Sequence, residues 1–455
     1  MKLLSSDTVA NARSTSARFR FIDLFAGVGG FHHALSSLGG QCALAVELDA
    51  DCRRVYAESF PDLAPRLIRT DIRELTRATA EADGVELDPS EILRRVPPHD
   101  VLCAGFPCQP FSKSGAQLGV RDKTRGTLFH DIMSIVIARK PKYVILENVR
   151  NLIGPRHEDT WITIRESLRE AGYLVADRPV IFSPHLLPEE LGGAPQVRDR
   201  VFVLARRPSR GTPSVPTCVP REPSFGWKPE DWKIERILEP NVDLPTYGLD
   251  PVEVGWLDAW QEFVQGLDCD VLPSVPIWVD FFVEHPRTAG MPDWKTEFVR
   301  KNSQFYMENR AFLDVWLKAR WGPNGDQVAD FPASRRKFEW QARSRQPTAD
   351  DRDLESLIAQ FRPSGIRVKP PTYAPALVAI TQTTILGPKV SSTSWRRLTP
   401  REAAQLQGIP FDGFDRAGMP DKTVYRQLGN AVNVGVVQHV AKALFADGGL
   451  AYTDS

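Results

Sequence analysis

The stretch that decides the fold reads FIDLFAGVGGF and runs from Phe21 to Phe31. An apolar run that ends in a glycine-rich turn and continues into an amphipathic stretch predicts a buried strand followed by a helix. Glycine lets the backbone turn sharply and lets a ligand approach it closely. A dinucleotide fingerprint needs glycine at its third position, where this chain has His32, so the sequence weakens a pyrophosphate-binding interpretation.

Similar apolar runs recur as far as residue 207 and alternate with longer amphipathic stretches. This alternation predicts an α/β fold with a mostly parallel sheet flanked by helices. The expected strands are Arg20 to Leu24, Cys42 to Glu47, Val101 to Ala104, Tyr143 to Glu147 and Arg200 to Ala205. Ligands of open α/β sheets bind at the carboxyl ends of the strands, so we expect the chemistry there.

Length and charge limit the classes of protein that fit. The chain has 455 residues, with 57 Lys and Arg against 57 Asp and Glu. At roughly 150 residues per domain, this length predicts about two to three domains. Zero net charge argues against a globally basic nucleic-acid-binding protein, so any nucleic-acid contact must use a local basic surface.

The sequence predicts neither a membrane-spanning segment nor a metal site. No apolar stretch approaches the roughly 20 residues that span a bilayer, and Met1 to Arg20 has no apolar signal core. We therefore expect a cytoplasmic protein without membrane contact and with a disordered tail over residues 1–18. The six cysteines form no C-x-x-C pair and no cluster with histidine at metal spacing, which predicts neither a metal site nor a disulfide framework.

A second domain is expected over residues 208–394. Ten of the eleven tryptophans lie between Trp227 and Trp395, and such aromatic density argues for an ordered domain. Its start is acidic, whereas Arg335, Arg336, Lys337, Arg343 and Arg345 form a basic segment suited to a polyanion. Residues 395–455 return to helical patterns, with Thr399, Pro400 and Glu402 predicting a capped helix start. Residues 76–98 receive no function from the sequence.

Two acids follow the glycine turn at positions that suit a nucleoside. Glu47 ends the next apolar run, where an acid can accept both hydroxyls of a ribose. Asp71 follows a shorter apolar run and suits an adenine amino group. Together the three features predict a cofactor that carries a nucleoside. The alternative is that the turn is only a tight connection and that both acids are solvated.

A second candidate site contains Cys108, which lies between two prolines after the apolar run that begins at Val101. Only the thiolate is a strong nucleophile, so a cysteine fixed in a turn at the carboxyl end of a strand is a good candidate. Cys103 lies inside the run and is expected to be a buried hydrophobe. The basic, glycine-containing stretch 113–127 predicts a mobile loop near the thiol, with an ordinary solvated loop as the alternative.

Polar residues at two further strand ends could hold a heterocycle. Glu147 and Asn148 could bind its edge, with Glu147 as a general acid or neutral donor, although helix capping is the alternative. Arg198 and Arg200 would share one face of a strand and suit a base edge or a phosphate. A cross-strand ion pair near Asp199 is the competing interpretation.

Taken in order, these blocks resemble the DNA cytosine-5 methyltransferases of prokaryotic restriction-modification systems. The matching motifs are DLFAGVGG from Asp23, Glu47, Asp71, GFPCQPFS from Gly105, ENV from Glu147, QVRDR from Gln196, RLTPRE from Arg397 and QLGNAV from Gln427. The resemblance covers residues 19–207 and 395–445. It implies a class I, Rossmann-like methyltransferase sheet with a smaller target recognition domain over residues 208–394.

The resemblance also implies the cofactor, S-adenosyl-L-methionine, which would leave as S-adenosyl-L-homocysteine. The residues that it assigns to this cofactor are Phe25, Ala26, Gly27, Val28, Gly29, Gly30, Glu47, Leu48, Asp71, Ile72, Pro107, Asn430 and Val432.

The implied substrate is a cytosine flipped out of double-stranded DNA, because chemistry on a base inside the stack is blocked. Cys108 would attack C6, Glu147 would hold and protonate N3, and C5 would accept the methyl group. Asn148 and Arg198 would position the base, and Arg200 is counted with them among the catalytic residues. A restriction endonuclease would act separately in such a system, and nothing in the sequence argues against a monomer.

Three alternatives remain at this level. An RNA cytosine methyltransferase shares the architecture, but the Cys-Phe-Thr element of the tRNA-modifying branch is not found here. A nicotinamide-dependent dehydrogenase would explain the glycine turn and Glu47 but not Cys108 or Glu147. A silent DNA-binding relative is disfavoured because the thiol, the acid and the amide are all present.

Overall fold

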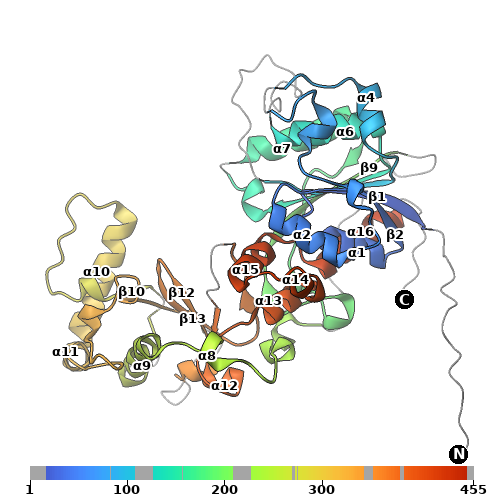
Figure 1. Cartoon of the computed structure of the whole chain (residues 1–455). Helices are drawn as coiled ribbons and strands as arrows, with labels where there is room; N and C mark the ends of the chain where they lie inside the picture. Colours follow the sequence, from blue (N-terminus) through green and yellow to red (C-terminus); the bar gives the residue numbers. More distant parts are fainter. Residues whose placement is uncertain are drawn as a thin grey trace, which may run out of the picture.

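The computed structural model describes residues 17–81, 84–107, 127–155, 157–208, 227–268, 272–273, 275–342, 352–379 and 384–447. These residues form two lobes (Figure 1). The first lobe is an eight-stranded sheet with the helices that cover it, and the second lobe is a six-stranded sheet with its own helices. None of the described helices has the length and apolarity needed to cross a lipid bilayer.

The sheet of the first lobe has the order β3-β2-β1-β4-β5-β9-β6, and β7 also pairs with β9. Its strands are β1 (Phe19–Leu24), β2 (Gly40–Val46), β3 (Ile68–Arg69), β4 (Val101–Gly105), β5 (Tyr143–Val149), β6 (Leu174–Val175), β7 (Val180–Phe182) and β9 (Arg200–Arg206). All five expected strands are present, with ends shifted by up to two residues. Glu47 follows β2 instead of ending it.

The expectation of a mostly parallel sheet is confirmed, because β9 is the one strand of the eight described that runs opposite to the others. Strand β9 runs antiparallel to β5, β6 and β7. The short strands β6 and β7 were not predicted, and they lead the chain to the carboxyl end of β5. Because β9 starts at that end and runs back, its first residues lie beside the last residues of β5.

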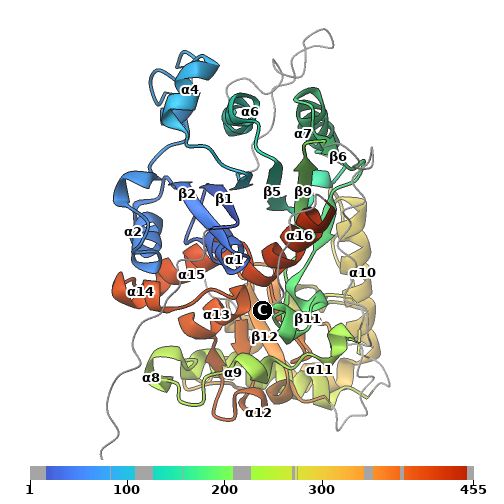
Figure 2. The ribbon, with the colours of Figure 1, turned by 90° about the vertical axis from the view of Figure 1, so that its right-hand side faces the viewer.

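Helices cover both faces of this sheet, as successive side chains of a strand point to opposite faces. Val101 and Cys103 of β4 belong to one apolar core, and Leu102 and Ala104 belong to the other. The first core lies under α1 (Gly30–Ser37) and α16 (Val434–Asp447), and the second lies under α6 (Leu128–Arg139) and α7 (Glu158–Glu170). Figure 2 shows α16 beside α1, so the end of the chain completes the first lobe.

The C-terminal motifs form helices that pack between the lobes (Figure 1). Helix α13 (Pro400–Gln407) begins with the predicted capping box, since the Thr399 side chain accepts from the Glu402 amide and the Glu402 side chain accepts from the Thr399 amide. This prediction is confirmed. Gly429 and Asn430 form the last residues of α15 (Asp421–Asn430).

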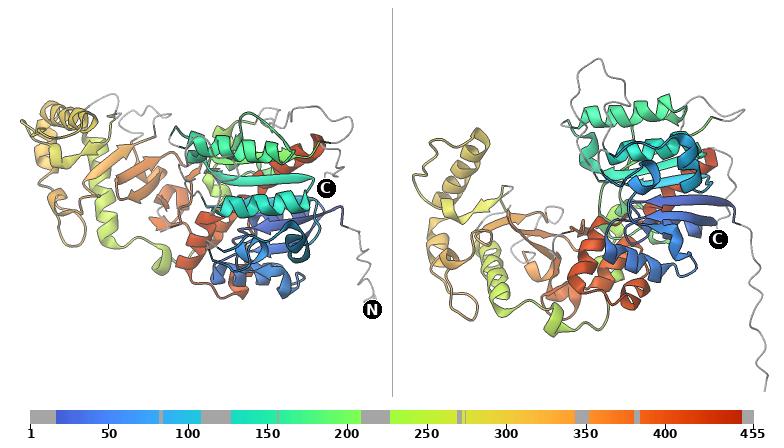
Figure 3. Two further views of the ribbon diagram at one scale, coloured as in Figure 1. Left: turned by 90° about the horizontal axis from the view of Figure 1, so that it is seen from above. Right: turned by 45° about the horizontal axis from the view of Figure 1, so that its top comes forward.

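The second lobe has a sheet in the order β10-β11-β13-β12-β15-β16. The strands are β10 (Ile277–Trp278), β11 (Lys337–Trp340), β12 (Ile358–Arg362), β13 (Gly365–Lys369), β15 (Thr384–Leu386) and β16 (Arg396–Arg397), the last of which lies beyond the expected boundary at 394. Its core contains the fully buried Trp260 of α9 (Pro251–Gly266) and Trp316 of α11 (Arg310–Trp316). Figure 3 shows this lobe extending to one side of the first.

Candidate active site

A cavity of about 740 Å³ lies at the carboxyl ends of β1, β2, β4 and β5. It opens where the strand order reverses, between β1 and β4, which is the expected ligand position in such sheets. The predicted site residues that line it are Phe25, Gly27, Glu47, Leu48, Asp71, Ile72, Pro107, Glu147, Asn148, Arg198, Arg200 and Asn430. The two predicted sites therefore share one space.

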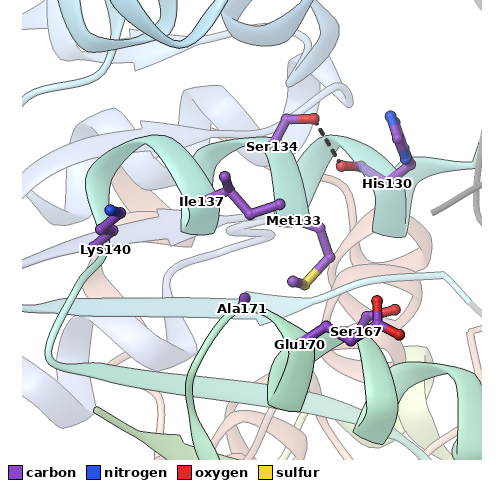
Figure 4. Close-up of a pocket in the computed structure, with 8 residues that line it drawn as sticks. All are labelled: His130, Met133, Ser134, Ile137, Lys140, Ser167, Glu170 and Ala171. Atoms are coloured by element: carbon purple, nitrogen blue, oxygen red, sulfur yellow. Dashed lines mark hydrogen bonds between the residues drawn. The ribbon is translucent and has the colours of Figure 1, made fainter. Parts of the chain in front are cut away.

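Another cavity, of about 400 Å³, lies between α6 and α7. Figure 4 shows Met133 of α6 pointing toward α7, with Ser134 and His130 on the same helix. None of the predicted site residues lines this cavity, and it lies away from the strand ends. The larger cavity is therefore the candidate active site.

The glycine turn after β1 requires glycine at two positions. Gly29 has a φ of +90°, and a Cβ there would lie 2.3 Å from the Phe60 ring. A Cβ on Gly30 would lie 2.6 Å from the Val432 side chain. Phe25 also has a positive φ, of 58°, which is uncommon for a side chain of this size and is often found at functional sites.

Glu47 fixes this turn in place. Its carboxylate accepts the Gly27 amide at 2.8 Å and the Asp49 amide at 2.7 Å, one on each oxygen. Each carboxylate oxygen can accept more than one hydrogen bond, so both can still accept from a ligand in the cavity. The acid at the end of β2 and the glycine turn thus form one unit.

Asp71 is held by Arg73, which the sequence interpretation missed. The Arg73 Nη2 atom lies 2.7 Å from Asp71 Oδ2, and its Nε lies 3.0 Å from Oδ1. Partial burial acts to raise the pKa of Asp71, but the hydrogen bonds from Arg73 outweigh it and lower that pKa. Nearby, Leu48 is 64% exposed at the edge of the cavity.

Several predicted cofactor residues do not line the cavity, namely Ala26, Val28, Gly29, Gly30 and Val432. The side chains of Ala26, Val28 and Val432 are buried in the apolar core under α1 and α16. Gly29 and Gly30 instead allow close packing against Phe60 and Val432. These five residues therefore support the turn on the side that faces away from the cavity.

Glu147 lies buried at the far side of the cavity, with its Oε1 atom 3.0 Å from Nε of Arg200. Burial raises the pKa of this carboxyl, although the positive charges of Arg200 and Arg198 act against the rise. A carboxyl with a raised pKa can donate a proton near neutral pH.

Asn148 joins β5 to the segment that follows β4. Its Nδ2 donates to the Phe106 carbonyl at 2.9 Å, and its Oδ1 accepts the Val149 amide at 2.8 Å. The next helical turn, Arg150–Ile153, has no side-chain cap. Helix capping therefore does not account for Glu147 or Asn148.

Arg198, which was expected to position a base, lines the cavity and is held there by backbone groups. It is buried and donates to the carbonyls of Leu377, Gly429 and Ala431 at 3.1, 2.9 and 2.8 Å. These bonds fasten two distant segments to the cavity wall. Arg200 takes the ion pair with Glu147, while Asp199 pairs with Arg150, so the two predicted arginines have different partners within the protein.

Further lining residues carry no sequence motif. Leu377, Val378 and Ala379 come from the segment between β14 (Ala374–Pro375) and β15, and Arg426 comes from α15. Arg426 also pairs with Asp49 at 3.1 Å. Its position next to QLGNAV is the one signal that could have indicated it.

Cys108 lies outside the described residues, as does nearly all of the stretch 113–127. The described chain reaches Pro107, which lines the cavity. Cys103 is buried, and its Sγ atom donates to the Ile22 carbonyl at 3.1 Å, which confirms the expectation of a buried hydrophobe. The described residues contain no cluster of side chains that could hold a metal ion.

The strand order, the reversed β9 and the glycine turn after β1 define a class I methyltransferase fold. The family model for C-5 cytosine-specific DNA methylases matches residues 19–248 and 294–446, and the chain belongs to this family. The enzyme is a DNA (cytosine-5)-methyltransferase, which removes the dehydrogenase alternative.

Named relatives agree with this assignment. The chain is 38% identical to the type II methyltransferase M.AluI of Cellulosimicrobium cellulans, over 94% of this chain and 92% of that protein. It is 30% identical to a DNA-cytosine methyltransferase of Escherichia coli K12, over 94% of this chain and 77% of that protein. The crystal structure of S. pombe Dnmt2 methyltransferase covers 94% of this chain and 98% of its own, with a TM-score of 0.49 and 17% identity.

Proposed function

We propose that this chain transfers a methyl group from S-adenosyl-L-methionine to C5 of a cytosine flipped out of double-stranded DNA. The observation that carries this proposal is the single cavity lined by both Glu47 and Glu147. One acid suits a nucleoside cofactor and the other suits a pyrimidine. A shared space is what direct transfer between two bound molecules requires.

The residues around Glu47 fit the cofactor. Both of its carboxylate oxygens are fixed by backbone amides and can still accept ribose hydroxyls. Leu48 offers an exposed apolar surface, and Asp71, Ile72 and Asn430 line the same side of the cavity. When bound, S-adenosyl-L-methionine supplies an electrophilic methyl group, and S-adenosyl-L-homocysteine is left.

The residues around Glu147 fit a cytosine. In the neutral form that burial favours, Glu147 donates a proton to ring N3, and Arg200 holds the carboxyl in place. We assign the nucleophile to Cys108, whose thiolate adds to C6 and makes C5 electron-rich. After C5 has taken the methyl group, the C5 proton is lost to solvent and the thiolate is expelled. Ring N3 then returns its proton to Glu147, which restores the ring.

Arg198 and Asn148 support this chemistry as positioning residues, since their polar atoms bind backbone groups of the cavity wall. We further propose that residues 19–207 and 395–455 form the catalytic domain and that 208–394 form a target recognition domain. The type II name of the 38% identical relative supports a separate cognate restriction endonuclease.

The test is transfer of a labelled methyl group to mixed-sequence duplex DNA and, in parallel, to tRNA, followed by nucleoside analysis. We expect labelled 5-methylcytosine in the DNA, its loss in Cys108→Ser, and its retention in Cys103→Ala. Cys103 is the matched control because it is a buried thiol in β4 that points away from solvent. Label in tRNA alone would contradict the proposal and identify the chain as an RNA cytosine methyltransferase.

A further inference from the structure

One face of the second sheet is polar, and the opposite face is apolar. Phe338 of β11 and Ile366 and Val368 of β13 belong to the core under α9 and α11. Because side chains alternate along a strand, Lys337, Glu339, Arg367 and Lys369 point to the other side. We call this the basic face, and Arg362 of β12 joins it through its pairing with Gly365.

The basic face is turned toward the first lobe. Ile358 lies opposite Lys369, and Leu386 lies opposite Ile358, so all three side chains share one side of the sheet. Ile358 and Leu386 belong to the core of the first lobe, together with Leu377. Figures 1 and 2 show α9 and α11 on the far side of this sheet from the first lobe. The chain then leaves Lys369 and reaches the cavity wall at Leu377.

The charges on the basic face are not balanced. Its one acid, Glu339, already accepts from Arg367, with Nη2 at 2.8 Å and Nε at 3.0 Å. Arg362 of β12 lies diagonally across from Arg367 of β13. Lys369 lies two positions after Arg367 on β13. Within the part of the chain that the structure describes, neither Arg362 nor Lys369 has an ion pair.

The pKa values report the same imbalance. Burial and then the charges of Arg367 and Arg362 lower the pKa of Lys369, and burial and Arg367 lower that of Arg362. Half-buried cations that repel one another cost stability, so the described fold alone gives no reason for them. An anionic partner would supply the missing charge.

Most described members of the basic segment that was selected from the sequence do not lie on the basic face. The Arg335 guanidinium lies 4.3 Å from the centre of the Phe361 ring, on the apolar side of the sheet. Arg336 pairs with Asp280 at 3.0 Å. Arg343 and Arg345 lie outside the described residues. Lys337 is the one described member of that segment on the basic face.

We propose that Arg362 and Lys369 each bind a backbone phosphate of duplex DNA whose target cytosine occupies the cavity. This inference rests on the proposed function, since it takes DNA as the substrate. Charge complementarity selects the partner, and the cavity wall at Leu377 ties the basic face to the site of chemistry.

The experiment measures the affinity for fluorescent mixed-sequence duplex DNA over a series of salt concentrations, so that no recognition sequence is needed. Each lost phosphate contact reduces the slope of log K against log salt concentration by about 0.9. We expect this reduction in Arg362→Gln and in Lys369→Gln, and recovery of the slope in Arg362→Lys and Lys369→Arg. Arg94→Gln is the control, because Arg94 is an exposed cation of α4 (Pro89–Arg95).

Unchanged slopes in both Gln variants would overturn the inference, provided that the wild type methylates DNA. A wild type that neither binds nor methylates DNA would instead refute the proposed function. Reduced slopes for tRNA with unchanged slopes for DNA would also overturn the inference. The charge-preserving variants separate a lost contact from misfolding, since a misfolded sheet would not recover with Lys or Arg.

Discussion

Nε of Arg200, the first residue of β9, lies 3.0 Å from Oε1 of Glu147 near the end of β5. The contact exists because β9 runs antiparallel to β5 and begins at its carboxyl end. The guanidinium holds the carboxyl in one orientation, while burial keeps its pKa raised. The reversed direction of β9 thereby places Arg200 where it orients Glu147.

Replacing Glu147 should slow catalysis while leaving the protein folded. Glu147→Gln keeps the shape but cannot deliver a proton, so we expect methyl transfer to slow by about 10²- to 10⁴-fold. Single-turnover transfer to DNA measures this effect. Arg150→Gln, which removes an exposed arginine near the same strand end, is the control. A variant within tenfold of the wild-type rate would show that Glu147 is not the acid.

Replacing Glu47 should weaken cofactor binding. Hydrogen bonds to a charged group contribute about 1.5 to 3 kcal/mol, so Glu47→Gln should lower the affinity for S-adenosyl-L-methionine by about tenfold or more. Calorimetric titration of the protein without DNA measures it. Glu58→Gln changes a half-exposed acid on α2 (Ala50–Ser59) and should leave cofactor binding like that of the wild type. Equal affinities for all three proteins would contradict the assignment.

Asp23 should make stability depend on pH. Its carboxyl is fully buried, and burial first and the charge of Glu47 second raise its pKa. The folded state therefore holds the proton more tightly than the unfolded chain, and this stability is present at low pH. It is lost as the pH rises from about 3.9 through the folded pKa, at about 1.4 kcal/mol per pH unit.

The neutral variant Asp23→Asn lacks this loss, so its stability relative to the wild type should increase with pH. Urea unfolding at a series of pH values measures the free energy of unfolding of both proteins. Parallel curves would mean that Asp23 does not take up a proton on folding.

Arg198 should matter for stability as well as for activity. Arg198→Met leaves three buried carbonyls without their donor, and each orphaned group costs about 1 to 3 kcal/mol. We expect the free energy of unfolding to fall by about 3 kcal/mol or more. Arg150→Met, an exposed change, should stay within about 0.5 kcal/mol. A loss of activity in Arg198→Met at wild-type stability would favour direct contact with the base.

Removing the acid of the basic face should strengthen DNA binding. Two unit charges about 4 Å apart in water interact by about 1 kcal/mol, so Glu339→Gln should raise the affinity for mixed-sequence duplex by about fivefold at low salt. Glu355→Gln changes a half-exposed acid of the second lobe that pairs with Lys389, and it should change the affinity little. Weaker binding by Glu339→Gln would show that the face does not meet the phosphates.

Local signals in the sequence predicted much of the first lobe. The apolar run before Gly27, the acids Glu47 and Asp71 and the pair Glu147–Asn148 all mark strand ends, and parallel strands bring such ends to one edge. The capping box of Thr399 and Glu402 is equally local. Such features were predictable because periodicity and turn chemistry involve only neighbouring residues.

Tertiary structure decided the rest. The sequence alone could not show that β9 is reversed, that Arg198 binds the carbonyls of Gly429 and Ala431, or that Arg367 and Lys369 share a face with Arg362. These relationships depend on strand pairing and on contacts between residues far apart in the chain, which local propensity does not encode. Packing within the two lobes fixes the register of the strands and thereby these relationships. A shift in register by one residue would turn each side chain of a strand to the opposite face of the sheet.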